Sequence, residues 1–209
     1  MQARRPSDPA APDAASPTRR RVLALGLVAL LAPQAPALAQ AWNLQALMRE
    51  LGTRKSAQAS FHETRTLSML SAPLESSGTL RFVAPDFLEM RTLQPSPQTF
   101  TVQGGQVSLE LGGKRHAFAL DQQPQVAALI DGLRATLDGD LAGLQRAYAT
   151  RLRGRRRLWT LELVPRASAA RGRISEIDVS GSAGTVLSIA IYQANGDHSL
   201  MTLREMPAP

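Results

Sequence analysis

The sequence predicts an α+β domain in which a meander of antiparallel strands is interrupted by two short helices. Segments between residues 59 and 120 and between 158 and 205 alternate apolar and polar side chains with period two, which is typical of strands with two unlike faces. Between residues 125 and 148 the apolar spacing changes to three and four, which indicates helix. Tight-turn pairs separate the strands: Pro85-Asp86, Gly104-Gly105, Gly112-Gly113 and Asn195-Gly196.

Residues 1–39 differ from the rest of the chain. Arg19-Arg20-Arg21 precedes the apolar run Val22–Leu31, and the small residues of Ala37-Leu38-Ala39 follow. This order is typical of a secretory signal peptide, and the apolar run is too short to span a bilayer. We therefore expect an N-terminal region with a signal over 1–39 and one domain over 40–209. The arginines also partly match a twin-arginine signal, so the sequence leaves the export route open.

Composition narrows the class of protein. The chain has no cysteine, so no disulfide supports the core. Position 40 is Gln, where a lipid-anchored protein would have Cys, and we expect a soluble periplasmic protein. Residues 1–39 hold five Arg and two Asp, which lowers the net charge of the remainder from +7 to +4. That excess, together with the signal peptide, argues against a nucleic-acid partner.

The elements before residue 121 follow from local patterns. Leu44, Leu47, Met48 and Leu51 predict a helix over 41–53 with Asn43 as its N-cap. Strands are expected over 59–67, 78–83, 87–93, 98–103, 106–111 and 114–120, with a loop over 71–77.

The elements after residue 121 are two helices and four strands. Helices are expected over 125–137 and 141–148, because Asp138-Gly139-Asp140 ends the first and caps the second. Strands are expected over 158–165, 174–180, 186–193 and 198–205.

Catalytic and metal-binding patterns are weak. No Gly-x-Ser-x-Gly motif occurs, and the nearest segment, 180–184, has the wrong spacing and lies between strands. His62, His116 and His198 stand on separate predicted strands without ligand spacing. We therefore expect no catalytic residue, no metal site, no cofactor and no enzymatic activity.

A basic patch follows the second helix. Its members are Arg151, Arg153, Arg155, Arg156 and Arg157. One interpretation is a solvated loop, since the chain uses Arg almost exclusively over Lys. The other is a docking patch for an acidic partner or an anionic lipid surface.

The apolar faces of the two helices need cover. A curved antiparallel sheet with helices laid into its mouth would bury them. The result is an ordinary core if the helices stay in place, or an apolar lipid cavity if they can lift. Patterning alone favours the ordinary core.

Several segments in order resemble one known family. They are Phe61-His-Glu-Thr-Arg, Ser77-Gly-Thr-Leu-Arg-Phe, Ala84-Pro-Asp-Phe-Leu-Glu-Met, Gln94-Pro, Val102-Gln-Gly-Gly-Gln-Val, Leu137-Asp-Gly-Asp, Trp159-Thr-Leu-Glu-Leu-Val-Pro, Ile174-Ser-Glu-Ile-Asp-Val and the final hairpin. Together they make the chain resemble the LolA-like outer-membrane lipoprotein carriers over nearly all of residues 40–209.

The resemblance implies an incomplete, strongly curved β-barrel with helices as a lid. It also implies a monomeric carrier that takes an acylated lipoprotein or other lipid cargo from an inner-membrane donor to an outer-membrane acceptor. The concave face would be the lipid-binding cavity. Its expected residues are Leu80, Phe82, Leu88, Met90, Phe100 and Val102 on the wall, with Leu129, Ile130 and Leu133 on the lid.

The chain departs from the well-studied branch of that family. Ala84 occupies the position of an arginine that ties down the lid, Met90 that of an inward tryptophan, and the sequence stops at Pro209. We expect a lid held differently or a wider cavity, and a cargo that need not be a lipoprotein. The alternative is a lipid-binding sensor domain that regulates a membrane partner. An esterase is a more distant third.

Overall fold

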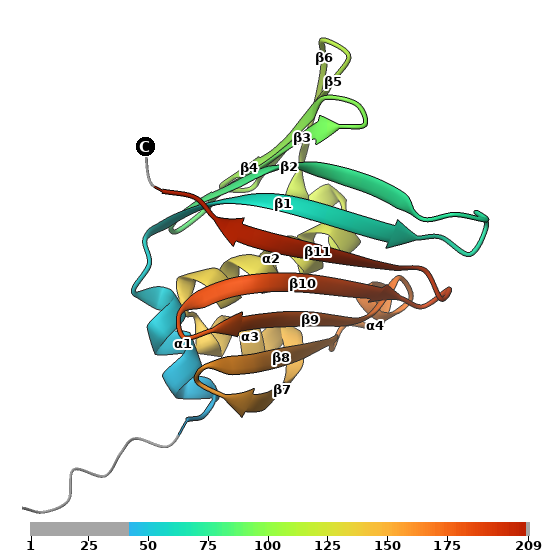
Figure 1. The fold of residues 1–209 in the computed structure, drawn as a ribbon. Helices are drawn as coiled ribbons and strands as arrows, with labels where there is room; N and C mark the ends of the chain where they lie inside the picture. Colours follow the sequence, from blue (N-terminus) through green and yellow to red (C-terminus); the bar gives the residue numbers. More distant parts are fainter. Residues whose placement is uncertain (1–41, 208–209) are drawn as a thin grey trace, which may run out of the picture. The chain divides into compact units, whose positions relative to one another are not determined.

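A single antiparallel sheet dominates the computed structural model, which describes residues 42–207. Its eleven strands follow the order β6-β5-β4-β3-β2-β1-β11-β10-β9-β8-β7 (Figure 1). They are β1 (Ser56–Thr66), β2 (Leu74–Val83), β3 (Phe87–Gln94), β4 (Gln98–Gln103), β5 (Gln106–Leu111), β6 (Lys114–Ala119), β7 (Tyr148–Arg155), β8 (Leu158–Pro165), β9 (Ile174–Ser182), β10 (Thr185–Gln193) and β11 (His198–Glu205). The sheet is curved and does not close, because β6 and β7 do not pair. The predicted fold class is therefore confirmed.

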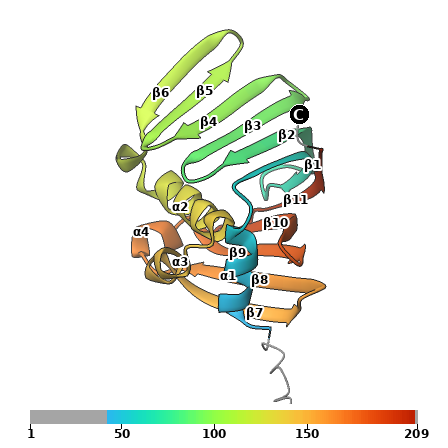
Figure 2. The ribbon, with the colours of Figure 1, turned by 90° about the vertical axis from the view of Figure 1, so that its left-hand side faces the viewer.

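The helices α1, α2 and α3 lie on the concave side of the sheet, and the short η1 and α4 lie at the ends of strands (Figure 2). They are α1 (Leu44–Gly52), the 3₁₀ turn η1 (Leu120–Gln122), α2 (Pro124–Asp138), α3 (Leu141–Ala147) and the short α4 (Ser168–Arg171). The predicted caps are present: the backbone N–H of Ala46 donates to Asn43, and that of Gly143 to Asp140. Gly139 ends α2 with φ +75°, the left-handed conformation that glycine adopts without strain.

Two segments expected as loops are strands. Residues 74–77 extend β2, with Leu74 opposite Arg65 of β1 and Ser77 opposite His62. Their polar side chains hid the alternation. Residues 148–155 form the edge strand β7, which pairs with β8, so the interpretation of the arginine patch as a loop was wrong for its first three members. Arg151, Arg153 and Arg155 occupy one face of this strand and gave the appearance of a charge run.

Two hydrophobic clusters form the core, and α2 contacts both. The larger cluster packs α1 and α3 against β7, β8 and β9, and includes the fully buried Leu47, Leu144, Tyr148, Trp159 and Leu163. The smaller cluster joins Val102, Val107 and Leu120 to Ile130 of α2. The two ends of the sheet are therefore packed, whereas among the described residues the middle strands β1, β2 and β11 contribute no side chain to either cluster.

The predicted signal peptide over 1–39 lies outside the described residues, and the domain limits stay a prediction.

Candidate functional site

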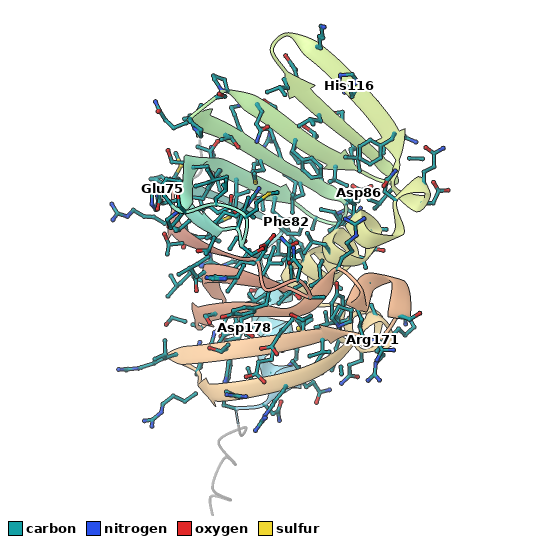
Figure 3. The ribbon with its side chains drawn as sticks, turned by 90° about the vertical axis from the view of Figure 1, so that its right-hand side faces the viewer. Glu75, Phe82, Asp86, His116, Arg171 and Asp178 are labelled. Atoms are coloured by element: carbon teal, nitrogen blue, oxygen red, sulfur yellow. The ribbon has the colours of Figure 1, made fainter. Side chains whose placement is uncertain are left out.

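An apolar cavity of about 430 Å³ lies between α2 and the concave face of the sheet. Eight of the nine residues predicted for the cavity do line it. Leu80, Phe82, Leu88, Met90 and Phe100 lie on a wall formed by β2, β3 and β4, called the first wall below, and Leu129, Ile130 and Leu133 lie on α2. Val102 does not line the cavity, because it is fully buried in the smaller core cluster beneath Leu120 and Ile130. Phe82, labelled in Figure 3, belongs to β2. That these residues bind a lipid stays a prediction.

Sequence reasoning missed the second wall of the cavity. Its apolar side chains come from β1, β9, β10 and β11, and they are Ala57, Ala59, Val179, Val186, Ile189, Ile191, Met201 and Leu203. Cross-strand pairing puts them on one face, since Glu63 lies opposite Met201, and Ile189 lies opposite both Met201 and Val179. The alternation over 186–205 was visible, but the pairing of β11 with β1, which sets this face beside the first wall, joins segments about 140 residues apart.

Polar groups enter this cavity at Glu63 and Arg65 of β1. Glu63 is only 6% exposed. The Arg65 Nη2 atom donates to both carboxylate oxygens of Glu63, at 3.2 and 3.1 Å, and the Ser76 hydroxyl donates to one of these oxygens at 3.2 Å. Near the other end of β1, Arg54 and Glu205 also line the cavity and form an ion pair.

Helix α2 is fastened to the first wall by Arg134. Its Nη1 donates to the Gly104 carbonyl at 3.0 Å and its Nη2 to the Asp86 carbonyl at 3.1 Å. Asp86 belongs to the Pro-Asp corner between β2 and β3 (Figure 3). Ala84, beside this corner, has no group that could reach the helix. In this chain the arginine of this contact, Arg134, belongs to the helix, and two backbone carbonyls of the first wall accept its hydrogen bonds.

The opposite side of α2 rests on Tyr148. The Tyr148 hydroxyl donates to the Ala128 carbonyl, and Gly132 lies so close that an added Cβ would stand 2.6 Å from the ring. Burial, followed by the charge of Asp131, raises the pKa of Tyr148 to about 12, so its hydroxyl remains a donor at physiological pH. Helix α2 is thus joined to the larger core cluster by close packing, and to the first wall by two hydrogen bonds and by the packing of Ile130 in the smaller core cluster.

The arginine patch lies along the edge of the sheet. Arg153 pairs with Glu162 of β8, and Arg156, in the β7–β8 turn, pairs with Glu50 of α1. Arg151, Arg155 and Arg157 are exposed. The structure gathers the patch at one edge, and its docking role stays a prediction.

An exposed apolar tip was not predicted. In the β1–β2 connection Met69 is 84% exposed and Leu70 is exposed, as is Leu74 at the start of β2. Residues 66–74 contain no charged side chain. The tip follows directly on Arg65, at the end of β1 where Glu63 lies.

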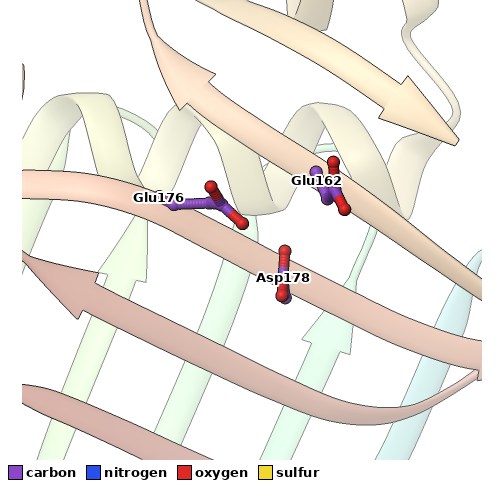
Figure 4. Close-up of side chains that lie close together, drawn as sticks. All are labelled: Glu162, Glu176 and Asp178. Carbon is purple, nitrogen blue, oxygen red and sulfur yellow. The ribbon is translucent and has the colours of Figure 1, made fainter.

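The outer face of β8 and β9 carries the acidic side chains Glu162, Glu176 and Asp178 (Figure 4). One ligand atom from each lies within 4.8 Å of the others. Burial, followed by the neighbouring Glu176, raises the pKa of Asp178 to about 6, and its Oδ1 has no hydrogen-bond partner among the described residues. Such a cluster alone does not define a metal site.

The histidines take no part in that cluster. His62 faces Glu75 on the outer side of the sheet, with Nε2 2.6 Å from the carboxylate.

Within residues 42–207 no helix is both long and apolar enough to cross a membrane.

Comparison of the sequence with family models identifies the protein family of this chain. The model for LolA-like outer membrane lipoprotein carrier proteins matches residues 32–204. The chain belongs to this LolA-like family. The family's members are binding or carrier proteins, which supports lipid or lipoprotein binding in general. No curated protein sequence matches the chain.

Solved structures similar to this LolA-like chain are distant. A LolA superfamily protein from Nitrosomonas europaea is 12% identical over 79% of this chain and 93% of its own, with a TM-score of 0.42. Lipoprotein LppX from Mycobacterium tuberculosis is 11% identical, over 79% and 97%, with a TM-score of 0.43. A chain of the Pseudomonas aeruginosa MucA/MucB complex is 17% identical, over 79% and 58%, also with a TM-score of 0.43.

Proposed function

We propose that this protein is a periplasmic carrier that shelters an acyl chain in the cavity under α2 and ferries it between the inner and outer membranes. The observation that carries the proposal is the cavity itself. Its volume of about 430 Å³ falls in the range of small-molecule sites, and its lining is predominantly aliphatic and aromatic. Each methylene that leaves water for such a site contributes about 0.8 kcal/mol, so ten of them provide a gross driving force of ~8 kcal/mol.

Loading requires α2 to move, and its fastening suits that step. The contacts of Arg134 with Asp86 and Gly104 are polar, reach turns at the surface, and can exchange with water. The packing of Gly132 on Tyr148 keeps the other side of the helix in place. In this proposal α2 lifts from the first wall, which also withdraws Ile130 from the smaller core cluster, while the helix remains attached to the larger core cluster.

Two surfaces suit contact with membranes and their proteins. The exposed tip at Met69 and Leu70 offers apolar side chains beside the Arg65 end of the cavity. The arginines of the β7 edge, with Arg151 and Arg155 exposed, provide the docking patch for an acidic partner or anionic lipid. The tip would contact a bilayer during loading and release, and the patch would hold the carrier near a donor or acceptor.

Lipid extraction and a matched pair of variants test the proposal. Lipid extracted from the purified protein is identified by mass spectrometry, and binding of a fluorescent acyl probe is titrated. Leu80→Trp places a larger side chain in the cavity and should weaken probe binding at least ~10-fold, because it excludes chain volume. Thr79→Trp, on the outer face of the same strand, should leave binding unchanged.

A lipid-free preparation that also ignores the probe would refute the carrier. Equal losses in the two tryptophan variants would show that the probe binds elsewhere. Movement of the probe from donor to acceptor vesicles separates a carrier from a sensor, since a sensor would hold its lipid at a fixed partner.

A further inference from the structure

We propose that Glu63, Arg65, Ser76 and Ser199 form a binding site for the polar head of the cargo, and that this head is uncharged with both a hydrogen-bond donor and an acceptor. The chemical class is a single-chain neutral amphiphile, such as a monoacylglycerol or an N-acyl amide. This inference rests on the proposed function, which it makes specific.

The strand register builds this head-group site on three neighbouring strands. Ser76 of β2 lies directly opposite Glu63 of β1, and Ser199 of β11 lies directly opposite Arg65. Glu63, Arg65 and Ser199 all line the cavity. They share the face of the sheet that carries the apolar walls, so a chain lying along those walls ends at this group.

Burial singles out the site. Among the charged side chains of residues 42–207, Glu63 alone is buried, and Ser199 is buried as well. A buried carboxylate is a weak source of stability even when it is paired, because its desolvation offsets the attraction of its partner. An apolar residue in place of Glu63 would serve the fold equally well, so the buried carboxylate, with the half-exposed Arg65 beside it in the cavity lining, points to a ligand.

The pair has bonding capacity left for that ligand. Arg65 uses only Nη2 in hydrogen bonds to other described residues, and about half of its side chain is exposed. A guanidinium has five N–H donors, and a carboxylate has about four acceptor positions, of which Arg65 and Ser76 occupy part. A head group can therefore accept from Arg65 while it donates to Glu63.

The charge of the site selects a neutral head. Glu63 and Arg65 sum to zero, so an anionic head gains from the arginine and loses to the glutamate, and a cationic head does the reverse. A hydroxyl or an amide uses both partners without either repulsion, through hydrogen bonds to charged groups.

The dimensions fit one chain. The cavity is lined by residues of β1 on both sides of Phe61, and its outermost lining residues there, Ala57 and Arg65, are eight residues or roughly 26 Å apart at the usual strand rise. Its volume equals that of roughly fourteen water-sized groups. The cavity as it stands therefore takes a single acyl chain with its head at Arg65, rather than several chains side by side.

Three probes with the same tetradecyl-length chain test the head-group site on the full chain. They are monomyristoylglycerol, myristate and tetradecyltrimethylammonium, and their dissociation constants are compared. We expect the glycerol ester to bind at least ~10-fold tighter than either ion, because hydrogen bonds to charged groups contribute that much. The double variant Glu63→Met, Arg65→Met should bind all three within about threefold of one another, with an unchanged or higher melting temperature.

The control is an ion pair with the same spacing on the outer face. Glu89→Met, Arg91→Met removes the pair of β3 and should keep the full preference for the ester. Should the double variant of β1 fail to fold, Ser199→Ala removes one polar group and should reduce the preference. Equal binding of the three probes by the natural protein, or a preference retained in the folded β1 variants, would overturn the head-group site and leave the carrier standing. Failure of every probe to bind would refute the carrier itself.

Discussion

Removing the guanidinium of Arg134 should loosen helix α2 without unfolding the domain. Arg134→Met keeps most of the apolar stem and deletes the two hydrogen bonds to the Asp86 and Gly104 carbonyls. Hydrogen bonds from a charged donor contribute about 1.5–3 kcal/mol each, and because these acceptors sit in turns near water we take ~2–3 kcal/mol for the pair. The ratio of open to closed α2 should therefore rise roughly 30- to 150-fold.

Hydrogen exchange and probe release measure this effect. Backbone amides of α2 should exchange faster by that factor, while amides of β8 and β9 in the larger core cluster keep their protection. A bound acyl probe should also dissociate faster. Arg146→Met, which removes an exposed arginine from α3, serves as the control and should change neither rate.

Two results would refute this reasoning. Unchanged exchange in α2 would mean that the two hydrogen bonds do not hold the helix. Faster exchange throughout the sheet would mean that Arg134 stabilises the whole fold and is not a local fastening.

Three further predictions concern stability and membrane contact. The folded-state pKa of Asp178 is raised from 3.8 to about 6, so its protonated form favours the native state below pH 4, and this contribution is lost as the pH rises to 6. The shift corresponds to at most ~3 kcal/mol, and solvent screening of a partly exposed carboxylate reduces this to ~1 kcal/mol. Asp178→Asn should therefore raise the free energy of unfolding by ~1 kcal/mol at pH 7, and should leave it unchanged at pH 3.5. Urea titrations at the two pH values measure this difference. Gly132→Ala should lower the free energy of unfolding by about 1–3 kcal/mol despite better helix propensity, because the new Cβ meets the buried Tyr148 ring; an unchanged thermal midpoint would contradict this. Replacing both Met69 and Leu70 by Ser should slow probe transfer from vesicles roughly 10-fold or more, since burying each side chain contributes about 1.5–3 kcal/mol, while the affinity for probe in solution stays the same.

The sequence predicted the elements whose signals are local. Two-residue turns and strict alternation located β3, β4 and β5, and the cap at Asp140 placed the break between α2 and α3. The same local signals failed at β7. There Thr150 and Leu152 face the core, but the arginines between and after them resemble a solvated run. Edge strands have only one partner, so charged side chains are common on them and blur the pattern.

The sequence predicted the first wall of the candidate site and the residues of α2, but not the second wall. Alternation assigned Leu80, Phe82 and Met90 to one face, and they do line the cavity. Patterning could not distinguish a cavity from a solid core, because both require the same apolar faces; only the family resemblance favoured the cavity. Contacts such as those of Glu63 with Ser76 and Arg134 with Asp86 depend on strand register and on the placement of α2, which no local signal specifies.

The two parts of the domain separate stability from binding. Strands β7 to β9 are covered by α1 and α3, and their inward Trp159, Leu161 and Leu163 are fully buried. The strands on either side of β1 face the cavity under α2, and this space stays open to a ligand. A large-to-small change at Trp159 should therefore cost folding stability, because a packed core leaves a void. The same change at Leu80 or Met201 enlarges a space that already exists and removes fewer contacts. Such a change should therefore lower the affinity and selectivity for cargo more than the melting temperature. This result is expected if the cavity in the middle of the sheet is a ligand site and not part of the core.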